Sequence, residues 1–142
     1  MIKKTITYKD YNDTERTEDF YFHLTEAELV DMQMSESGGL GELIQRVTNA
    51  RDDIVTYNIF KDLFYRAYGE KSPDGKRFIK TKEVKDAFMQ TEAASIIFMS
   101  LMQNEEEAAA FVNGIIPKKL LEEAAKVQKG KKANIAALPA DN

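Results

Sequence analysis

Residue types that perform acid–base, nucleophilic or redox chemistry are sparse in this chain of 142 residues. It has no cysteine and one histidine, His23, so any Ser–His–Asp or Cys–His system would depend on that single residue. His23 lies among aromatic residues, with no strained nucleophile turn nearby. Gly38-Gly39-Leu40-Gly41 lacks both the spacing and the lysine of a phosphate-binding loop. We therefore predict that the protein is not an enzyme and binds no cofactor.

The best candidate for a metal site is the loop around Gly75. With Gly75 at the sixth position of a calcium-binding loop, Glu70, Ser72 and Asp74 fall on the first, third and fifth positions. The twelfth position, where a bidentate glutamate is required, is then Thr81. The sequence therefore predicts a tight turn here and no calcium site.

Three successive carboxylates, Glu105 to Glu107, also suggest a metal ligand set. Adjacent residues on a helix splay around its axis, so these side chains cannot converge on one ion. Asn104 supplies a capping side chain before them, and acids in a first turn oppose the positive end of the helix dipole. This pattern predicts a helix that begins after Asn104 and ends at Asn113-Gly114.

The elements that would position any site begin with a strand that leads into a helix. Apolar and polar residues alternate over 19–24, which is the period of a half-buried strand. Thr25 stands three residues before Glu28, a capping box that satisfies two amide donors at a helix start. Leu24 and Leu29 occupy the staple positions that flank this cap.

The fold class that these patterns predict is α+β, mostly helical, with an N-terminal β-hairpin over residues 2–24 followed by about five or six helices. A second alternating segment near the N-terminus and the turn-rich residues 10–14 complete the hairpin. Only helical periods follow, so we expect fewer than four strands in the sheet. A single domain over residues 1–129, with helices from 25 to 129, and a flexible tail over 130–142 fit the composition.

The first three helices are predicted from apolar spacing and helix stops. The first spans 26–35, and the second is built around apolar positions between 40 and 47. The third is capped by Asp52 or Asp53 and ends before Gly69. Its apolar face consists of Phe60, Leu63, Phe64 and Ala67.

The longest helix is predicted over 81–103. A heptad-like seam runs along it, formed by Val84, Phe88, Thr91, Ser95, Phe98 and Met102. Its second half is apolar nearly all round, which is typical of a helix that is central to a core or shared with a partner. A last helix is predicted over 118–128, after Pro117.

The charge is unevenly distributed. Residues 117–142 hold six lysines against three acids, a net charge of +3, and the other 116 residues therefore carry −7. An acidic body repels phosphate backbones, so we predict no nucleic-acid binding by the folded part. The basic end either contacts an acidic partner or keeps the chain soluble, and we favour the second. The longest nearly apolar run is about half of a membrane span, so we predict no membrane partner.

Three strings of residues carry a family resemblance. They are Glu18-Asp19-Phe20-Tyr21-Phe22, Tyr68-Gly69-Glu70-Lys71 and Asn113-Gly114-Ile115-Ile116-Pro117. In these strings, and in the order of elements over residues 1–117, the chain resembles the tail assembly chaperones of long-tailed (siphovirus-type) bacteriophages or prophages. None of the strings is a catalytic signature, so the resemblance implies no catalytic residue.

The resemblance implies a protein that acts in the host bacterial cytoplasm during tail assembly. Members of that family bind the tape measure protein, keep it soluble while the tail tube polymerises around it, and do not enter the virion. The major tail protein and a longer, frameshifted form of the chain are further candidate partners. Two alternatives stay open: a minor structural protein of the phage tail, and a helical nucleic-acid-binding or regulatory adaptor.

A partner-binding surface is predicted on the apolar helices. Its residues are Phe98, Met99 and Met102 on the 81–103 helix, with Leu120 and Leu121 on the last helix. Methionine side chains adapt to many apolar surfaces, as a chaperone requires. We also predict a homo-oligomer, because a short hairpin leaves two strand edges and the 81–103 helix carries more apolar surface than a small domain easily covers.

Overall fold

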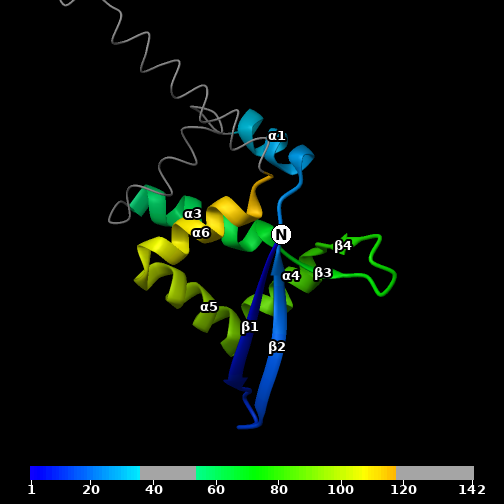
Figure 1. Ribbon diagram of the computed structural model, residues 1–142, viewed down its shortest axis with the longest axis vertical. Coiled ribbons are helices and arrows are strands. Elements are labelled where there is room, and N and C mark those ends of the chain that lie inside the picture. Colours follow the sequence, from blue (N-terminus) through cyan, green and yellow to red (C-terminus); the bar gives the residue numbers. More distant parts are fainter. Residues whose placement is uncertain (36–53, 118–142) are drawn as a thin grey trace, which may run out of the picture.

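The computed structural model describes residues 1–35 and 54–117. Within these residues about half of the chain is helical, and four strands form one antiparallel sheet in the order β1-β2-β3-β4 (Figure 1). The chain begins with a β-hairpin, and five helices follow it in the described part. The predicted α+β class, with an N-terminal hairpin ahead of the helices, is confirmed.

The hairpin consists of β1 (Ile2–Lys9) and β2 (Glu15–Phe22), paired antiparallel along their whole length. Side chains alternate between the two faces of β2, so that Phe20 and Phe22 are buried. In the connecting turn, the carboxylate of Asp10 accepts hydrogen bonds from two backbone N–H groups at 2.8 and 3.0 Å. The turn therefore holds the register that places the two phenylalanines on the core side.

Two short strands extend the sheet. β3 (Tyr68–Lys71) pairs with β2 at two positions, and its other edge pairs with β4 (Phe78–Ile79). The expectation of fewer than four strands is wrong. The segment after the third helix forms a strand because the edge of β2, distant in sequence, supplies hydrogen-bond partners for its backbone. Ser72 to Gly75 form the predicted tight turn between β3 and β4, with Gly75 at a φ of 75°.

The helices nearest the hairpin follow the sequence patterns. α1 (Glu26–Ser35) begins after Thr25 and spans the predicted residues. α3 (Ile54–Ala67) buries the predicted face of Phe60, Leu63, Phe64 and Ala67. Both helices are held by apolar faces, since propensity alone rarely stabilises so short a helix.

The single helix predicted over 81–103 is wrong. The structure has two helices there, α4 (Lys82–Met89) and α5 (Glu92–Gln103). Thr91 causes the break: its Oγ1 accepts a hydrogen bond from the Ala94 backbone N–H at 3.1 Å and donates one to the Phe88 carbonyl at 2.6 Å. The hydroxyl thus ends one helix and caps the next.

The break also changes which residues of α5 face the core. Ser95, a predicted seam position, is exposed. The buried side of α5 instead consists of Ala93, Ala94, Ile97 and Leu101. The heptad-like seam therefore fails at Ser95, because it assumed one continuous helical phase, although Phe98 and Met102 still pack partly against the core.

α6 (Glu105–Ile115) starts where predicted, with the Asn104 side chain accepting from the Glu107 backbone N–H at 3.1 Å. It continues past the predicted stop at Gly114. A Cβ atom at Gly114 would clash with the side chain of Ile2, so glycine lets α6 pack closely on β1. This glycine serves helix–strand packing instead of ending the helix.

The core is centred on the ring of Phe22, which is fully buried. Rings from three helices and β3 surround it at centroid distances of 5.2–5.8 Å; these rings belong to Phe64, Tyr68, Phe88 and Phe111. Edge-to-face and tilted pairs of this kind are the geometry that aromatic rings prefer. One hairpin residue therefore ties together helices that are distant in sequence.

Several predicted features lie outside the described residues. These are the second helix with the caps at Asp52 or Asp53, the last helix over 118–128 with Leu120 and Leu121, and the tail over 130–142. The domain boundary at residue 129 stays a prediction.

Candidate partner-binding surface

Three of the five predicted partner-binding residues lie together on α5. Phe98 is half-buried, and its ring centroid lies 5.3 Å from that of Phe64 and 6.1 Å from that of Phe60. Met102 is also half-buried and packs against the core. Both residues therefore stabilise the fold with one side and reach the surface with the other.

Met99 is the exposed member of the predicted set, with 47% of its surface accessible. Ile96 stands one turn before it and is 39% exposed, so the two side chains are neighbours on the outer side of α5. Tyr57 of α3 is 39% exposed and packs edge-on against Phe98 at a centroid distance of 6.0 Å. We use the name α5 face for the apolar side chains of α5 that reach the surface, namely Ile96, Phe98, Met99 and Met102, together with Tyr57 of α3.

Sequence reasoning missed two members of this face. The exposure of Ile96 could have been predicted if Ala93 and Ile97 had been assigned to the core side of the helix, because the helical period then directs residue 96 outward. Tyr57 could not have been found, because its contact with Phe98 joins segments about 40 residues apart, which no local pattern encodes.

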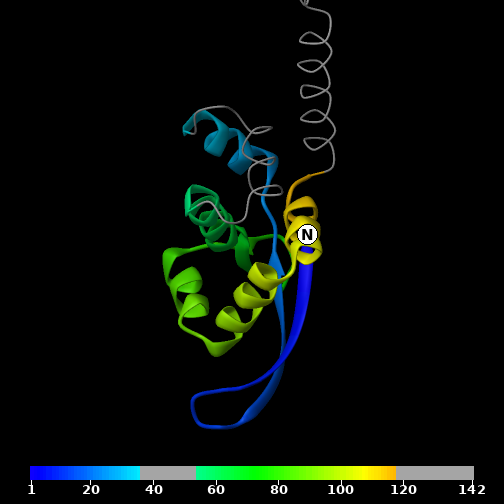
Figure 2. The same cartoon turned by 90° about the vertical axis from the view of Figure 1, so that its left-hand side faces the viewer.

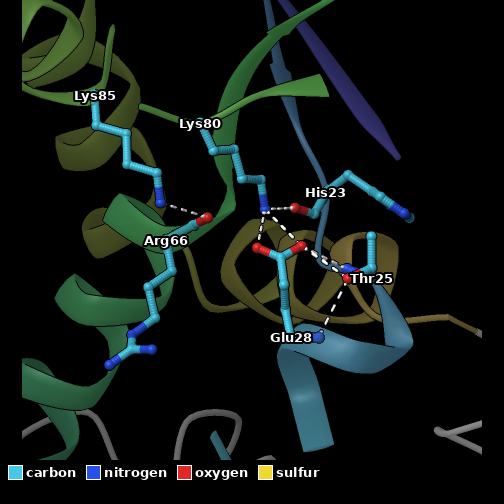
Figure 3. A network of polar contacts seen from close by, with 6 residues as sticks. All are labelled: His23, Thr25, Glu28, Arg66, Lys80 and Lys85. Atoms are coloured by element: carbon cyan, nitrogen blue, oxygen red, sulfur yellow. Dashed lines mark hydrogen bonds and ion pairs between the residues drawn. The ribbon is translucent and has the colours of Figure 1, made fainter. Parts of the chain in front are cut away.

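A polar network joins the start of α1 to the residues that follow β2 and β4 (Figure 3). Lys80 Nζ donates to the His23 carbonyl at 2.6 Å and to both carboxylate oxygens of Glu28, at 3.0 and 2.8 Å. Glu28 also accepts from the backbone N–H of Thr25 at 2.9 Å, and the Thr25 hydroxyl accepts from the Glu28 N–H at 3.2 Å. The predicted capping box is confirmed, and Lys80 extends it.

Both charged partners of this network are partly buried. Burial raises the pKa of Glu28, but hydrogen bonds from Lys80 and Thr25 outweigh it, so that the pKa lies below its usual value. Burial lowers the pKa of Lys80, and the bonds to Glu28 partly restore it. We take the ion pair as the state at neutral pH, because its geometry satisfies both groups.

His23 belongs to this network through its backbone. Its carbonyl receives Lys80, and its N–H donates to the Ala67 carbonyl at 2.8 Å. Its ring packs edge-on against Phe78, and its Nδ1 is buried without a hydrogen-bond partner in the described part of the chain. Burial lowers the pKa of His23, and the positive charges of the N-terminal amine and Lys80 lower it further. The backbone of His23 therefore links β2 to Lys80 and to the end of α3, and its imidazole ring stays neutral.

The two groups of carboxylates considered as metal ligands contain residues that accept hydrogen bonds from nearby residues. Asp74 accepts from the Ser72 hydroxyl at 2.6 Å and from the Lys76 backbone N–H at 3.0 Å, within the β3–β4 turn. Glu107 accepts from the Ser100 hydroxyl at 2.7 Å. Among the residues that the structure describes, no three metal-ligand side chains come together.

An exposed apolar helix face is suited to holding another polypeptide, and comparison with known families specifies the context. Residues 1–141 match the family described as phage tail assembly chaperone. The chain belongs to this family. Tail assembly chaperones are generally non-enzymatic, and membership implies phage tail proteins as partners. No curated protein and no solved structure matches the chain.

No helix within residues 1–35 and 54–117 is long and apolar enough to cross a membrane.

Proposed function

We propose that this tail assembly chaperone binds the tape measure protein through the α5 face. It keeps that protein soluble in the host bacterial cytoplasm and assists tail tube assembly without entering the virion. Family membership supports the role in tail assembly, and the resemblance described above supplies the partner. The major tail protein and a longer form of the chain are further partners of the same assembly reaction.

The observation that carries the mode of binding is the exposed pair Ile96 and Met99. The rest of α5's large apolar side chains are buried or half-buried, whereas these two neighbours are 39% and 47% exposed. An amphipathic partner helix can lay its apolar face against such a surface. The unbranched methionine adapts to different partner side chains, which suits a long client with many similar segments.

The gain from covering this pair can be estimated. Full burial of a Met or Ile side chain contributes about 1.5–3 kcal/mol, so burial of the exposed 47% and 39% contributes about 1 kcal/mol each. Loss of both corresponds to a roughly 30-fold weaker complex. Because the contact is apolar, added salt should weaken it little. A contact between exposed charges would weaken, since salt at about 0.1 M screens charges over a distance of about 10 Å.

The test is co-expression of the tape measure protein with this chain, followed by pull-down at low and high salt. The variant Ile96→Glu/Met99→Glu is expected to lose capture and solubilisation. The control Ala110→Glu/Asn113→Glu places the same charges at the same spacing on the exposed side of α6, and is expected to behave as the wild type. If the tape measure protein is equally soluble alone and never co-purifies, the proposed function is wrong.

Two other outcomes identify a different mechanism or role. Binding that disappears at high salt and on deletion of residues 117–142 assigns the contact to the basic segment and overturns the α5 face. Recovery of the protein in purified virions identifies a minor structural protein of the tail, and a salt-sensitive shift of DNA identifies a nucleic-acid adaptor.

A further inference from the structure

The hairpin leaves two strand edges without a partner in the described part of the chain. β2 pairs with β3 only at Tyr21 and Phe22, so its edge over residues 15–20 carries no strand on that side. β1 is the outermost strand of the sheet, and no described strand pairs with its outer edge. The turn end of the hairpin extends beyond the helices in both views (Figures 1 and 2). Open edges of this length are templates for another strand.

The two edges carry opposite charge. β1 holds Lys3, Lys4 and Lys9 and no acid. β2 holds three acids against one arginine; the acids are Glu15, Glu18 and Asp19. None of the three lysines forms an ion pair within the residues that the structure describes. The positive charges of β1 can therefore enter a contact with another molecule.

These charges select among the ways in which two copies could join. Lysines on an edge strand normally oppose pairing, because two like edges would place charges of one sign opposite each other. Pairing of β1 with β1 or of β2 with β2 meets that repulsion. Pairing of β1 with β2 places lysines opposite acids, so the same charges favour it.

We propose that β1 of one copy adds antiparallel to the open edge of β2 in a second copy and continues its sheet. The contact joins two different surfaces, so the first copy keeps its β2 edge free, the second keeps its β1 edge free, and the contact can repeat. The product is a ring if the rotation between copies closes, and a filament if it does not.

One register of this pairing places opposite charges across from each other and also keeps the core-facing side chains of both strands on the same face of the sheet. Lys3 opposite Asp19 and Lys4 opposite Glu18 keep odd and even residues on their own faces of the sheet. The same register sets Ile2 opposite Phe20, an apolar pair. It ends before Tyr21, where β3 takes over the edge of β2.

The structure also provides space for the incoming Lys4 side chain. A cleft of about 410 Å³ opens where β2 and β3 diverge, and its lining includes Glu18, Phe20, Tyr68 and Glu70. Lys4 is the charged residue in the core-facing row of β1, otherwise formed by Ile2, Ile6 and Tyr8. In the proposed register it points to the face of β2 that carries Glu18, so its ammonium meets carboxylates and its stem meets rings.

This self-association is separate from the proposed function. It uses the hairpin edges instead of the α5 face, and it needs no tape measure protein. A measurement of mass on the purified full chain therefore tests it whether or not the chaperone captures a client.

The experiment is light scattering of the full chain over micromolar concentrations at low salt. Wild-type protein is expected to exceed the monomer mass of 16.2 kDa. The variants Lys3→Glu/Lys4→Glu and Glu18→Lys/Asp19→Lys each give both edges one sign, and each is expected to self-associate at least about tenfold more weakly. An equimolar mixture restores opposite edges between the two variants and is expected to recover the assembly.

The two variants disturb the hairpin to different extents, because Glu18→Lys/Asp19→Lys also removes the carboxylates that accept from the Tyr8 and Thr5 hydroxyls. Lys3 and Lys4 lie opposite Tyr21 and Phe20 within one copy, so their reversal places no like charges directly opposite. Circular dichroism checks the fold, and Lys61→Glu/Lys76→Glu, at exposed positions elsewhere, controls for net charge. Wild-type protein that stays at 16.2 kDa throughout, or a mixture that stays monomeric while wild-type protein assembles, overturns the proposal.

Discussion

The substitution Glu28→Gln tests how much the network around Lys80 stabilises the fold. The amide would keep an acceptor for the Thr25 N–H but would remove the negative charge from Lys80, whose side chain is only 14% exposed. Breaking a fully buried ion pair costs about 3–5 kcal/mol, and breaking an exposed one about 0–1 kcal/mol. The Glu28 side chain is 35% exposed, so we expect a loss of about 2 kcal/mol. For a chain of this size, that lowers Tm by roughly 5–10 °C.

The assay is urea and thermal unfolding followed by circular dichroism at neutral pH. Glu83→Gln, which removes an exposed acid from the first turn of α4, is the control and should cost only a few tenths of a kcal/mol. A double-mutant cycle with Lys80→Met isolates the pair, and we expect the double variant to lose clearly less than the sum of the single losses. A Glu28→Gln variant as stable as the control, or additive single losses, would refute the argument.

Three further predictions follow from buried or constrained residues. Burial and nearby positive charge lower the pKa of His23, the only histidine, so the folded state binds fewer protons than the unfolded state. The stability that this difference contributes is present above about pH 6.5 and is lost as the pH falls below that value. Urea unfolding of His23→Gln at several pH values should therefore show a flatter pH dependence than the wild type. Phe22→Ala, at the centre of the core, should cost about 3–5 kcal/mol in urea unfolding, whereas the exposed Tyr11→Ala should cost little. Gly75→Ala should cost about 1–2 kcal/mol because of its φ of 75°, despite open space around it; an unchanged Tm would contradict the strain argument.

The parts of the fold that could be predicted from sequence are those encoded over a few residues. The Thr25–Glu28 capping box, the Asn104 cap and the apolar face of α3 each depend on neighbours within one or two turns. A side chain that satisfies a backbone amide three residues away leaves its signature in the local sequence. These elements therefore formed where their residues indicated.

The parts that could not be predicted depend on distant partners or on a choice between two local roles. β3 exists because β2 offers it an edge, and Lys80 joins the capping box across 52 residues. Thr91 fits a helix interior as well as a cap, and the hydrogen bonds of its hydroxyl to the Phe88 carbonyl and the Ala94 N–H become evident only in the folded chain. The α5 face was located in part, because Met99 and Phe98 were named, but their different exposure follows from the position of α3.

The bonds between the first and last described elements have a consequence for synthesis. The N-terminal amine donates to the Gly114 carbonyl at 3.2 Å, and the Leu24 N–H donates to the Ile115 carbonyl at 2.9 Å. Translation adds roughly 5–20 residues per second, so α6 leaves the ribosome roughly 5–20 s after the hairpin. During that interval the core side of the hairpin has no α6 to cover Phe22. A member of a chaperone family thus passes through a stage in which its own nascent chain presents apolar surface, and the chaperones of the cell that synthesises it would encounter it there.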